Sequence, residues 1–367
     1  MNILFLTTHL NTGGISIYIK TLAREFRQRG HRIFIVSSGG DMEDEIARIG
    51  VEHFIFNIRT KSEISPKIYL ALKKLNRLIK EKNIEIIHAQ TRVTQVMGTL
   101  AAKMTGRVFL STCHGYFKPR LVRRIFPCWG KTVIAISEPV VQHLTKDFKI
   151  NKQRIALISN GLDIRDFPII DDNTRQQRHR EFDLNDSPVI GIIARLSEVK
   201  GHSILIKAMN LIIQKFPKAV LLIIGQGNME NSLKQMVGEL NLQNNVRFLP
   251  IVNQTSAVLG LMDIFVMPSL QEGLGLAVME AQASGLPVVA SRVGGLPSLI
   301  EDGKTGLLVR PNDSQELAVA IVKLLKDPAK AKALGLSARK FIEKEFSSIK
   351  MAEDTLRVYQ HLLLKNQ

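Results

Sequence analysis

The chain has 367 residues, more than one ordinary core needs, and 45% of them are apolar, which excludes a disordered protein and favours two domains of usual size. No apolar run approaches the roughly 20 residues that span a bilayer, and the N-terminus lacks the pattern of a secretory signal, so we expect a cytoplasmic protein. The net charge of +17 is uneven, because residues 1–180 hold 30 lysines and arginines against 15 acidic residues, whereas residues 181–367 hold 20 against 18. A basic first half favours an anionic partner such as a membrane surface, a phosphorylated acceptor or nucleic acid.

The first half of the chain alternates strand-like and helix-like segments. Apolar, β-branched runs typical of strands lie at 2–6, 32–37, 51–56, 84–88, 107–112, 132–136 and 154–158. Between the first two, Ile15, Ile19, Leu22 and Phe26 recur at helical spacing, and Gly30 ends the pattern. Near-continuous apolar strands that alternate with helices predict a parallel sheet covered on both faces.

The composition changes around residues 166–187, a polar and weakly periodic stretch that we interpret as a linker. A second series follows, with strands expected at 188–193, 219–224, 246–249, 263–267, 287–290 and 306–309. Helices are expected at 200–215, 229–240, 274–284, 313–326, 328–346 and 348–365. The sequence therefore predicts an α/β protein of two doubly wound, Rossmann-like domains, 1–170 and 185–347, that face each other across a cleft. The last helix, about 348–367, can pack back on the first domain.

Residues 267–289 carry the most specific pattern in the chain. A strand passes through a glycine-rich turn that contains Glu272 into a helix that we expect to begin near Leu274. Such a turn presents unpaired backbone N–H groups and the positive end of the helix dipole to an anion. At a rise of about 1.5 Å per residue, Glu280 would lie about two turns along this helix, roughly 9 Å from its start. Two carboxylates that flank backbone donors suit a molecule with hydroxyl groups at both ends and a diphosphate between them.

This stretch resembles the signature of glycosyltransferase family 4, whose members have the GT-B fold. The pattern Pro-Ser-x-x-Glu-Gly-x-Gly-x-x-x-x-Glu-Ala-x-Ala-x-Gly-x-Pro-Val-Val begins at Pro268. Further matches are 13–14, 160–163, 294–295, 300–303 and 305–308. The resemblance covers nearly the whole chain. It implies a retaining hexosyltransferase that takes its sugar from a nucleotide diphosphate sugar and requires neither a metal ion nor another cofactor.

The resemblance implies roles for individual residues. Glu272 is expected to bind hydroxyl groups of the donor sugar, and Glu280 those of the ribose. Arg195 and Lys200 are expected to neutralise the diphosphate, and two cations five residues apart on a strand-to-helix loop suit that task. Further donor contacts are expected from Gly225, Gly227, Ile251, Gly273, Leu274, Gly275 and Leu276.

Two features of the first half complete the expected donor site. Gly13 and Gly14 open the first helix, and the resemblance implies that the backbone of Gly14 approaches the donor phosphate. His114 ends a strand, at a place where the family often has a histidine that contacts the donor sugar. The neighbouring Cys113 offers a cysteine–histidine nucleophile as an alternative, although a free cysteine after an apolar run is usually a buried hydrophobe.

The acceptor is indicated only by charge. Ile68, Leu72, Leu75 and Ile79 form one face of a helix expected at 64–82, and the rest of that helix is rich in lysine and arginine. The other residues expected on the acceptor side are Lys118, Arg120, Arg123, Arg124 and Asn160. We interpret the protein as a peripheral enzyme on the inner face of the plasma membrane, which extends a lipid-linked or phosphorylated saccharide of the cell envelope.

Three other classes of protein fit less well. A nucleotide-sugar epimerase of the same architecture lacks the paired glutamates, and a non-catalytic binding subunit would be expected to have lost Glu272, Arg195 or Lys200. A nucleic-acid binder is disfavoured by the 6% aromatic content and by the lack of a recognisable binding module. The histidines and acidic residues show no spacing typical of a metal site.

Overall fold

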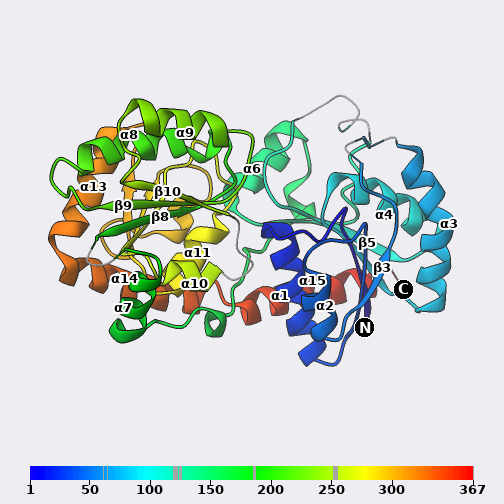
Figure 1. Cartoon of the computed structure of the whole chain (residues 1–367). Coiled ribbons are helices and arrows are strands. Elements are labelled where there is room, and N and C mark those ends of the chain that lie inside the picture. Colours follow the sequence, from blue (N-terminus) through cyan, green and yellow to red (C-terminus); the bar gives the residue numbers. More distant parts are fainter. Residues whose placement is uncertain are drawn as a thin grey trace. The chain divides into compact units, whose positions relative to one another are not determined.

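The computed structural model describes residues 1–60, 62–63, 65–118, 123, 126–184, 187–250 and 255–366 (Figure 1). The chain forms two compact units, which we call the first unit (Met1–Gly161 with Ser348–Gln367) and the second unit (Leu162–Ser347). Each is a parallel sheet covered by helices, so the predicted pair of Rossmann-like folds is confirmed. The first unit ends at Gly161, before the predicted boundary at 170, and the C-terminal helix belongs to it.

The first unit holds a seven-stranded sheet in the order β3-β2-β1-β4-β5-β6-β7, and all neighbouring strands are parallel. Its strands are β1 (Asn2–Leu6), β2 (Arg32–Ser37), β3 (Glu52–Ile55), β4 (Ile86–Ala89), β5 (Val108–Cys113), β6 (Val133–Ala135) and β7 (Ile155–Leu157). Its helices are α1 (Gly14–Gln28), α2 (Glu43–Arg48), α3 (Pro66–Glu81), α4 (Arg92–Thr105), α6 (Glu138–Asp147) and α15 (Ser348–Leu364). The order of the strands reverses between β1 and β4, and in such folds ligands bind at the carboxyl ends of the strands on either side of that reversal.

The core of the first unit lies on both faces of its sheet, because side chains along a strand alternate between the faces. Ile3 and Phe5 of β1 pack with residues of α1 and α15, whereas Leu4 and Leu6 pack with residues of α3 and α4. This double burial explains why β1 is an unbroken apolar run in the sequence.

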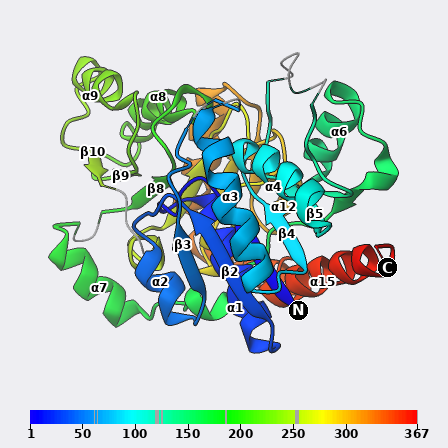
Figure 2. The ribbon, with the colours of Figure 1, turned by 90° about the vertical axis from the view of Figure 1, so that its right-hand side faces the viewer.

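The C-terminal helix α15 is part of the first unit's core. It packs beside α1 (Figures 1 and 2), and Tyr359 is fully buried between them and the sheet. The Tyr359 hydroxyl lies 2.6 Å from Nδ1 of His88 on β4, and the Ser348 hydroxyl donates to the Glu25 carboxylate at 2.8 Å. These hydrogen bonds satisfy polar groups that burial would otherwise leave without partners.

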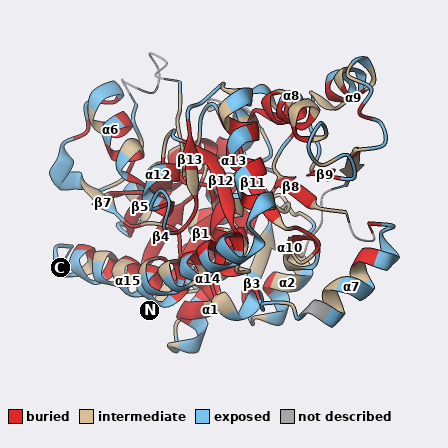
Figure 3. Cartoon of the chain, turned by 90° about the vertical axis from the view of Figure 1, so that its left-hand side faces the viewer, coloured by how far each residue is buried: buried red, intermediate tan, exposed pale blue. Residues whose placement is uncertain are grey.

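The second unit holds a six-stranded parallel sheet in the order β10-β9-β8-β11-β12-β13. Its strands are β8 (Val189–Ile193), β9 (Val220–Ile224), β10 (Val246–Leu249), β11 (Ile264–Met267), β12 (Val288–Ser291) and β13 (Leu307–Val309). Its helices are α7 (Asp172–Glu181), α8 (His202–Ile212), α9 (Glu230–Glu239), α10 (Thr255–Leu259), α11 (Leu276–Ala283), α12 (Leu296–Leu299), α13 (Ser314–Lys326) and α14 (Pro328–Glu345). The central strands are buried (Figure 3), and the order reverses between β8 and β11.

The segment predicted to be a linker instead contains α7, so this part of the prediction is wrong. Asp171 caps the helix, because its carboxylate accepts a hydrogen bond from the Thr174 backbone N–H at 3.0 Å. Arg175 then forms an ion pair with Asp263, which precedes β11. The helix has no apolar stripe, so hydrophobic periodicity could not reveal it. Its cap fixes where it begins, and its ion pair with Asp263 attaches it to the rest of the second unit.

Across the described part of the chain, no helix combines the length and the apolar character that crossing a membrane requires.

Candidate active site

The loops that follow the strands of the second sheet meet at the switch point between β8 and β11. The loop after β11 bonds to the loop after β8, because the Leu270 N–H donates to the Val199 carbonyl at 2.8 Å. The loop after β9 also joins them, since the Leu196 N–H donates to the Gln226 carbonyl at 3.0 Å. This convergence brings the predicted diphosphate ligands and the glycine-rich turn to one edge of the sheet, where ligands bind in such folds.

Lys200 and Glu272 form the central contact of this edge. The Lys200 ammonium donates to Oε2 of Glu272 at 2.5 Å, and the side chains are only 21% and 12% exposed. The other carboxylate oxygen, Oε1, lies 3.1 Å from the Gly273 backbone N–H, which donates to it. The two residues expected to bind the diphosphate and the sugar are therefore paired with each other.

Gly294 and Gly295 pack directly against the backbone of the turn that carries Glu272. A Cβ added at Gly294 would stand 1.8 Å from the Glu272 carbonyl oxygen, and one added at Gly295 would stand 2.4 Å from the Gly273 carbonyl oxygen. The Gly295 N–H also donates to the Glu272 carbonyl at 3.3 Å. Only glycine fits such a close approach between two backbones.

The other predicted donor residues of the second unit lie along the same edge. Arg195 is exposed, and no ion pair to it occurs among the described residues, so its charge is available to an anion. Gly225 and Gly227 lie against the loop after β8, where an added Cβ would stand 2.1 Å from the carbonyl oxygens of Ala194 and Leu196, respectively. Ile251 lies outside the described residues.

The helix after the glycine-rich turn begins at Leu276, with Gly275 as its N-cap, two residues later than expected. Glu280 is therefore just over one turn into the helix, not two, and its side chain is buried at 4% exposure. Leu274 is buried as well and lies before the helix. The displaced start follows from Gly273 and Gly275, which favour a turn over helix.

In the first unit, Gly13 and Gly14 lie where α1 begins, after the loop that follows β1. A Cβ added at Gly14 would have no atom within 4 Å, so the space beside its backbone is open among the described residues. The close ligand approach that the resemblance implies for Gly14 stays a prediction.

His114 follows β5 and lies next to the switch point of the first sheet. Its Nε2 is 2.8 Å from Oε1 of Gln90, and its ring meets the ring of Tyr18 edge-on at a centroid distance of 4.8 Å. Burial lowers the pKa of His114 to about 3, so the imidazole is neutral at physiological pH.

Cys113 does not have the environment of a nucleophile. It is fully buried, its Sγ donates to the Gly115 carbonyl at 3.2 Å, and burial raises the pKa of the thiol to about 12. A reactive cysteine needs a lowered pKa and some exposure, so the cysteine–histidine alternative finds no support.

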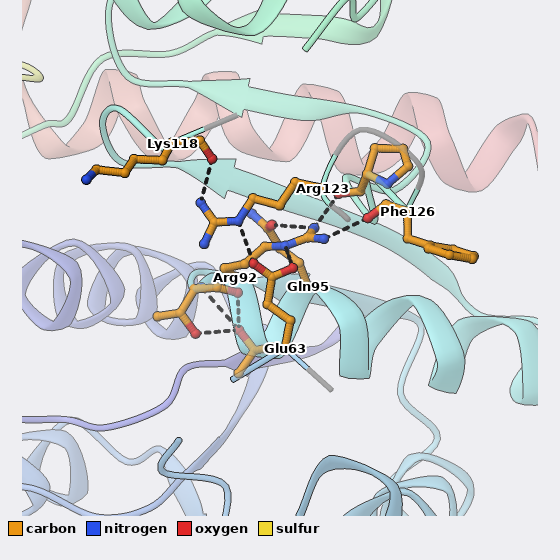
Figure 4. A network of polar contacts seen from close by, with 9 residues as sticks. Glu63, Arg92, Gln95, Lys118, Arg123 and Phe126 are labelled. Atoms are coloured by element: carbon orange, nitrogen blue, oxygen red, sulfur yellow. Dashed lines mark hydrogen bonds and ion pairs between the residues drawn. The ribbon is translucent and has the colours of Figure 1, made fainter. Parts of the chain in front are cut away.

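Arg123, from the basic segment after β5, and Arg92 share the carboxylate of Glu63 (Figure 4). Glu63 accepts from Arg123 at 2.5 Å and from Arg92 at 2.9 Å, and Arg92 also donates to the Phe126 carbonyl at 2.7 Å. Burial works to raise the pKa of Glu63, but its hydrogen bonds to both arginines bring it below the usual range. The charge of Arg123 is therefore compensated, whereas the exposed ammonium of Lys118 points away from the network.

Of the remaining residues expected on the acceptor side, the structure describes Asn160. Asn160 lies after β7 with its side chain buried, and its Oδ1 has no hydrogen-bond partner in the described part of the chain. Arg120 and Arg124 lie outside the described residues. The acceptor-side assignments therefore stay predictions.

The described residues also bear on other kinds of site. No group of three or more histidine, cysteine, aspartate or glutamate side chains is placed to hold a metal ion within the ranges described. A cavity of about 500 Å³ lies in the second unit at the amino ends of β8, β11 and β12, lined in part by Pro188, Asp263 and Pro287. It is at the opposite edge of the sheet from Lys200 and Glu272, so it is not the predicted donor site.

Gln90 was not among the residues predicted for the site. This buried amide directly follows β4 and contacts His114. A polar residue immediately after an apolar strand, at the edge where ligands bind, was a usable signal.

Two Rossmann-like units in one chain are the architecture expected of a GT-B protein. The model of the group 1 glycosyl transferases matches residues 174–341, and that of glycosyltransferase family 4 matches residues 12–166. The chain belongs to glycosyltransferase family 4, and its GT-B fold and glycosyltransferase class agree with the expectation from residues 267–289.

Individual proteins resemble the chain over its whole length. It is 29% identical to the capsular polysaccharide biosynthesis glycosyltransferase CapM of Staphylococcus aureus, and the match covers 98% of both chains. The crystal structure of a glycosyltransferase from Rickettsia africae has a TM-score of 0.88 at 26% identity and covers 100% of this chain and 99% of that one. The fold is shared with Anabaena HepE in complex with UDP and glucose, at a TM-score of 0.88 and 22% identity, over 98% of this chain and 100% of that one.

Proposed function

We propose that the protein is a retaining glycosyltransferase that moves a hexosyl group from a nucleotide diphosphate sugar to a lipid-linked or phosphorylated saccharide. A UDP-sugar is the favoured donor, ahead of a GDP-sugar. The observation that carries the proposal is the Lys200–Glu272 pair at the switch point of the second sheet, with the exposed Arg195 in the same loop as Lys200. The similarity to CapM supports a product that belongs to a cell-envelope glycan.

The proposed mechanism starts with an exchange of partners at this pair. The diphosphate of the donor takes the Lys200 ammonium from Glu272, and Arg195 adds a second cation. The released Glu272 carboxylate then accepts hydrogen bonds from hydroxyl groups of the sugar, while Glu280 binds the ribose. Because cations stabilise the leaving diphosphate, the reaction needs no metal ion or cofactor.

The transfer itself is a same-face substitution. The bond between the anomeric carbon and the leaving phosphate oxygen breaks, and a bond forms between that carbon and the acceptor hydroxyl oxygen. The proton of the acceptor hydroxyl passes to the departing phosphate. We propose that the first unit supplies the acceptor contacts and that Gly14 and His114 contact the donor.

Nucleotide binding tests the donor assignment directly. UDP should raise the melting temperature, because a ligand present at 100 times its Kd stabilises the folded state by about 2.7 kcal/mol. GDP and ADP should raise it less, because a UDP-sugar is the favoured donor. Lys200→Met should remove this shift, since it deletes a diphosphate ligand. Lys207→Met, which removes an exposed lysine of the same unit, should keep it. Unchanged melting temperatures with all three nucleotides would contradict the donor site.

A basic and partly apolar surface on α3 supports peripheral membrane binding of the first unit, which carries nearly all of the net charge. Lys67, Lys73 and Lys80 are exposed, and no ion pair to any of them occurs within the described ranges. Tyr69 and Met104 lie on the same surface and are 52% and 65% exposed. Cations beside exposed apolar side chains suit a surface of anionic lipid.

Vesicles of anionic lipid should bind the protein at low salt and release it at high salt, because the attraction is screened. Replacing Lys67, Lys73 and Lys80 by glutamate should abolish sedimentation with the vesicles. The matched control replaces three exposed lysines of the second unit, Lys323, Lys326 and Lys330. Equal loss in both variants would show a response to net charge alone and would refute α3 as the membrane-binding surface.

A further inference from the structure

Gln90 occupies the switch point of the first sheet. It directly follows β4, and its backbone N–H donates to the carbonyl of Leu6, the last residue of β1, at 2.9 Å. Its side chain is only 1% exposed. A buried amide must find partners for both its oxygen and its nitrogen, so the groups around it decide which way it points.

Two contacts decide the orientation of this amide. Nε2 donates to the His88 carbonyl oxygen at 3.5 Å, and Oε1 lies 2.8 Å from Nε2 of His114. The reverse orientation would place Oε1 against the His88 carbonyl, two acceptors with no proton between them. Because Oε1 has no proton to give, His114 must donate this hydrogen bond from Nε2.

The proton on Nε2 leaves the other ring nitrogen of His114 as an acceptor. A neutral imidazole carries a single proton, and burial keeps His114 neutral. No hydrogen bond to its Nδ1 occurs among the described residues. The edge-on contact with Tyr18, with 79° between the ring planes, also holds the ring in place.

We propose that Gln90 is the positioning residue that holds His114 in the Nε2–H tautomer, so that Nδ1 accepts a hydrogen bond from a hydroxyl group of the donor sugar. This inference rests on the proposed function, because it takes the sugar to bind beside His114. It also predicts a specificity. A sugar with a hydroxyl group at that position is accepted, whereas one with a carboxylate or a methyl ether there has no proton to donate and is rejected.

The tautomer can be observed in the unmodified protein. With ¹⁵N-labelled histidine, two-bond ¹H–¹⁵N correlation spectra distinguish the two neutral tautomers, and His114→Asn assigns the signals of His114. The expected result at pH 7 is a single Nε2–H tautomer. In Gln90→Leu the signals should move toward a mixture of tautomers. In Gln95→Leu, which replaces another buried glutamine of the first unit, they should not move. An Nδ1–H tautomer in the wild-type protein would overturn the inference.

Kinetics with Gln90→Glu separate positioning from packing. The titratable groups around His114 are His88, Tyr18 and Cys113. Each is neutral at pH 7, since burial lowers the pKa of His88 to about 3 and raises the pKa values of Tyr18 and Cys113. A carboxylate at position 90 still accepts from Nε2 but raises the pKa of His114, so Nδ1 gains a proton as the pH falls. The donor KM of Gln90→Glu should rise toward low pH and recover at high pH, while that of the wild-type enzyme stays flat.

Gln90→Leu should raise the donor KM about threefold to tenfold at every pH, in line with the loss of one hydrogen bond, and should spare binding of UDP alone. An unchanged donor KM in both Gln90 variants overturns the inference even if transfer by the wild-type enzyme is robust. Conversely, the protein could show the Nε2–H tautomer and yet bind no nucleotide. That result would support the role of Gln90 in holding His114 and would refute the proposed function.

Discussion

Glu272→Gln should reduce kcat/KM for sugar transfer by at least about 100-fold, comparable with the loss of one charged group that acts on the transition state. The amide has nearly the same shape as the carboxylate but lacks its charge, so hydrogen bonds from the sugar hydroxyl groups weaken. Binding of UDP should be retained or become tighter, because Lys200 no longer has to leave a carboxylate that lies 2.5 Å away. Isothermal titration with UDP and a radiolabelled transfer assay measure the two effects.

The control for Glu272→Gln is Glu230→Gln, which breaks another lysine–glutamate pair of the same unit. Glu230 and Lys234 lie 2.7 Å apart on α9, and both are exposed. Exposed pairs of this kind contribute roughly 0–1 kcal/mol, so this variant should transfer sugar at the wild-type rate. If Glu272→Gln lost UDP binding together with transfer, the carboxylate would have a structural role, and the proposed exchange of partners would be wrong.

Gly294→Ala should lower the free energy of unfolding by about 3 kcal/mol, as overpacking and an unfavourable backbone conformation add together. Its φ is +54°, and its new Cβ would stand 1.8 Å from the Glu272 carbonyl oxygen, which is backbone and cannot rotate away. The turn that carries Glu272 would have to shift, so nucleotide-sugar binding should be lost as well. Urea denaturation followed by circular dichroism measures the change in stability.

Gly303→Ala is the matched control for the backbone term. Gly303 also has a positive φ, +77°, but a Cβ there would have no atom within 4 Å. Only the conformational cost remains, about 1 kcal/mol, and donor binding should be unaffected. Equal urea midpoints for the two alanine variants would show that the contact with Glu272 is not what requires a glycine at position 294.

Much of the fold was predictable because its strands are buried on both faces. β1, β8 and β9 are unbroken apolar runs in the sequence, and the helices between them have regular apolar spacing. The prediction was wrong for α7, which has no apolar stripe and depends on a cap and on an ion pair with a distant residue. A local sequence pattern does not show which distant residue an arginine will pair with.

The candidate site was predictable as a set of residues and not as a set of contacts. Glu272 and Lys200 were singled out separately, but they lie 72 residues apart, and nothing in the sequence indicates that they bind one another. Gln90 and His114 meet only because β4 and β5 are neighbours in the sheet. Such pairs follow from the order of the strands in the sheet, which the structure shows and the sequence pattern does not.

The burial of α15 in the first unit also sets the order in which the protein can mature. The sheet of that unit begins at Asn2, yet Tyr359, which contacts His88, lies at the far end of the chain. On the ribosome, the first unit must therefore wait for the last helix, and the second unit has all of its residues available earlier. A nascent chain stopped before Ser348 would expose the apolar surface of α1 that α15 covers, and chaperones recognise such surfaces in incomplete proteins.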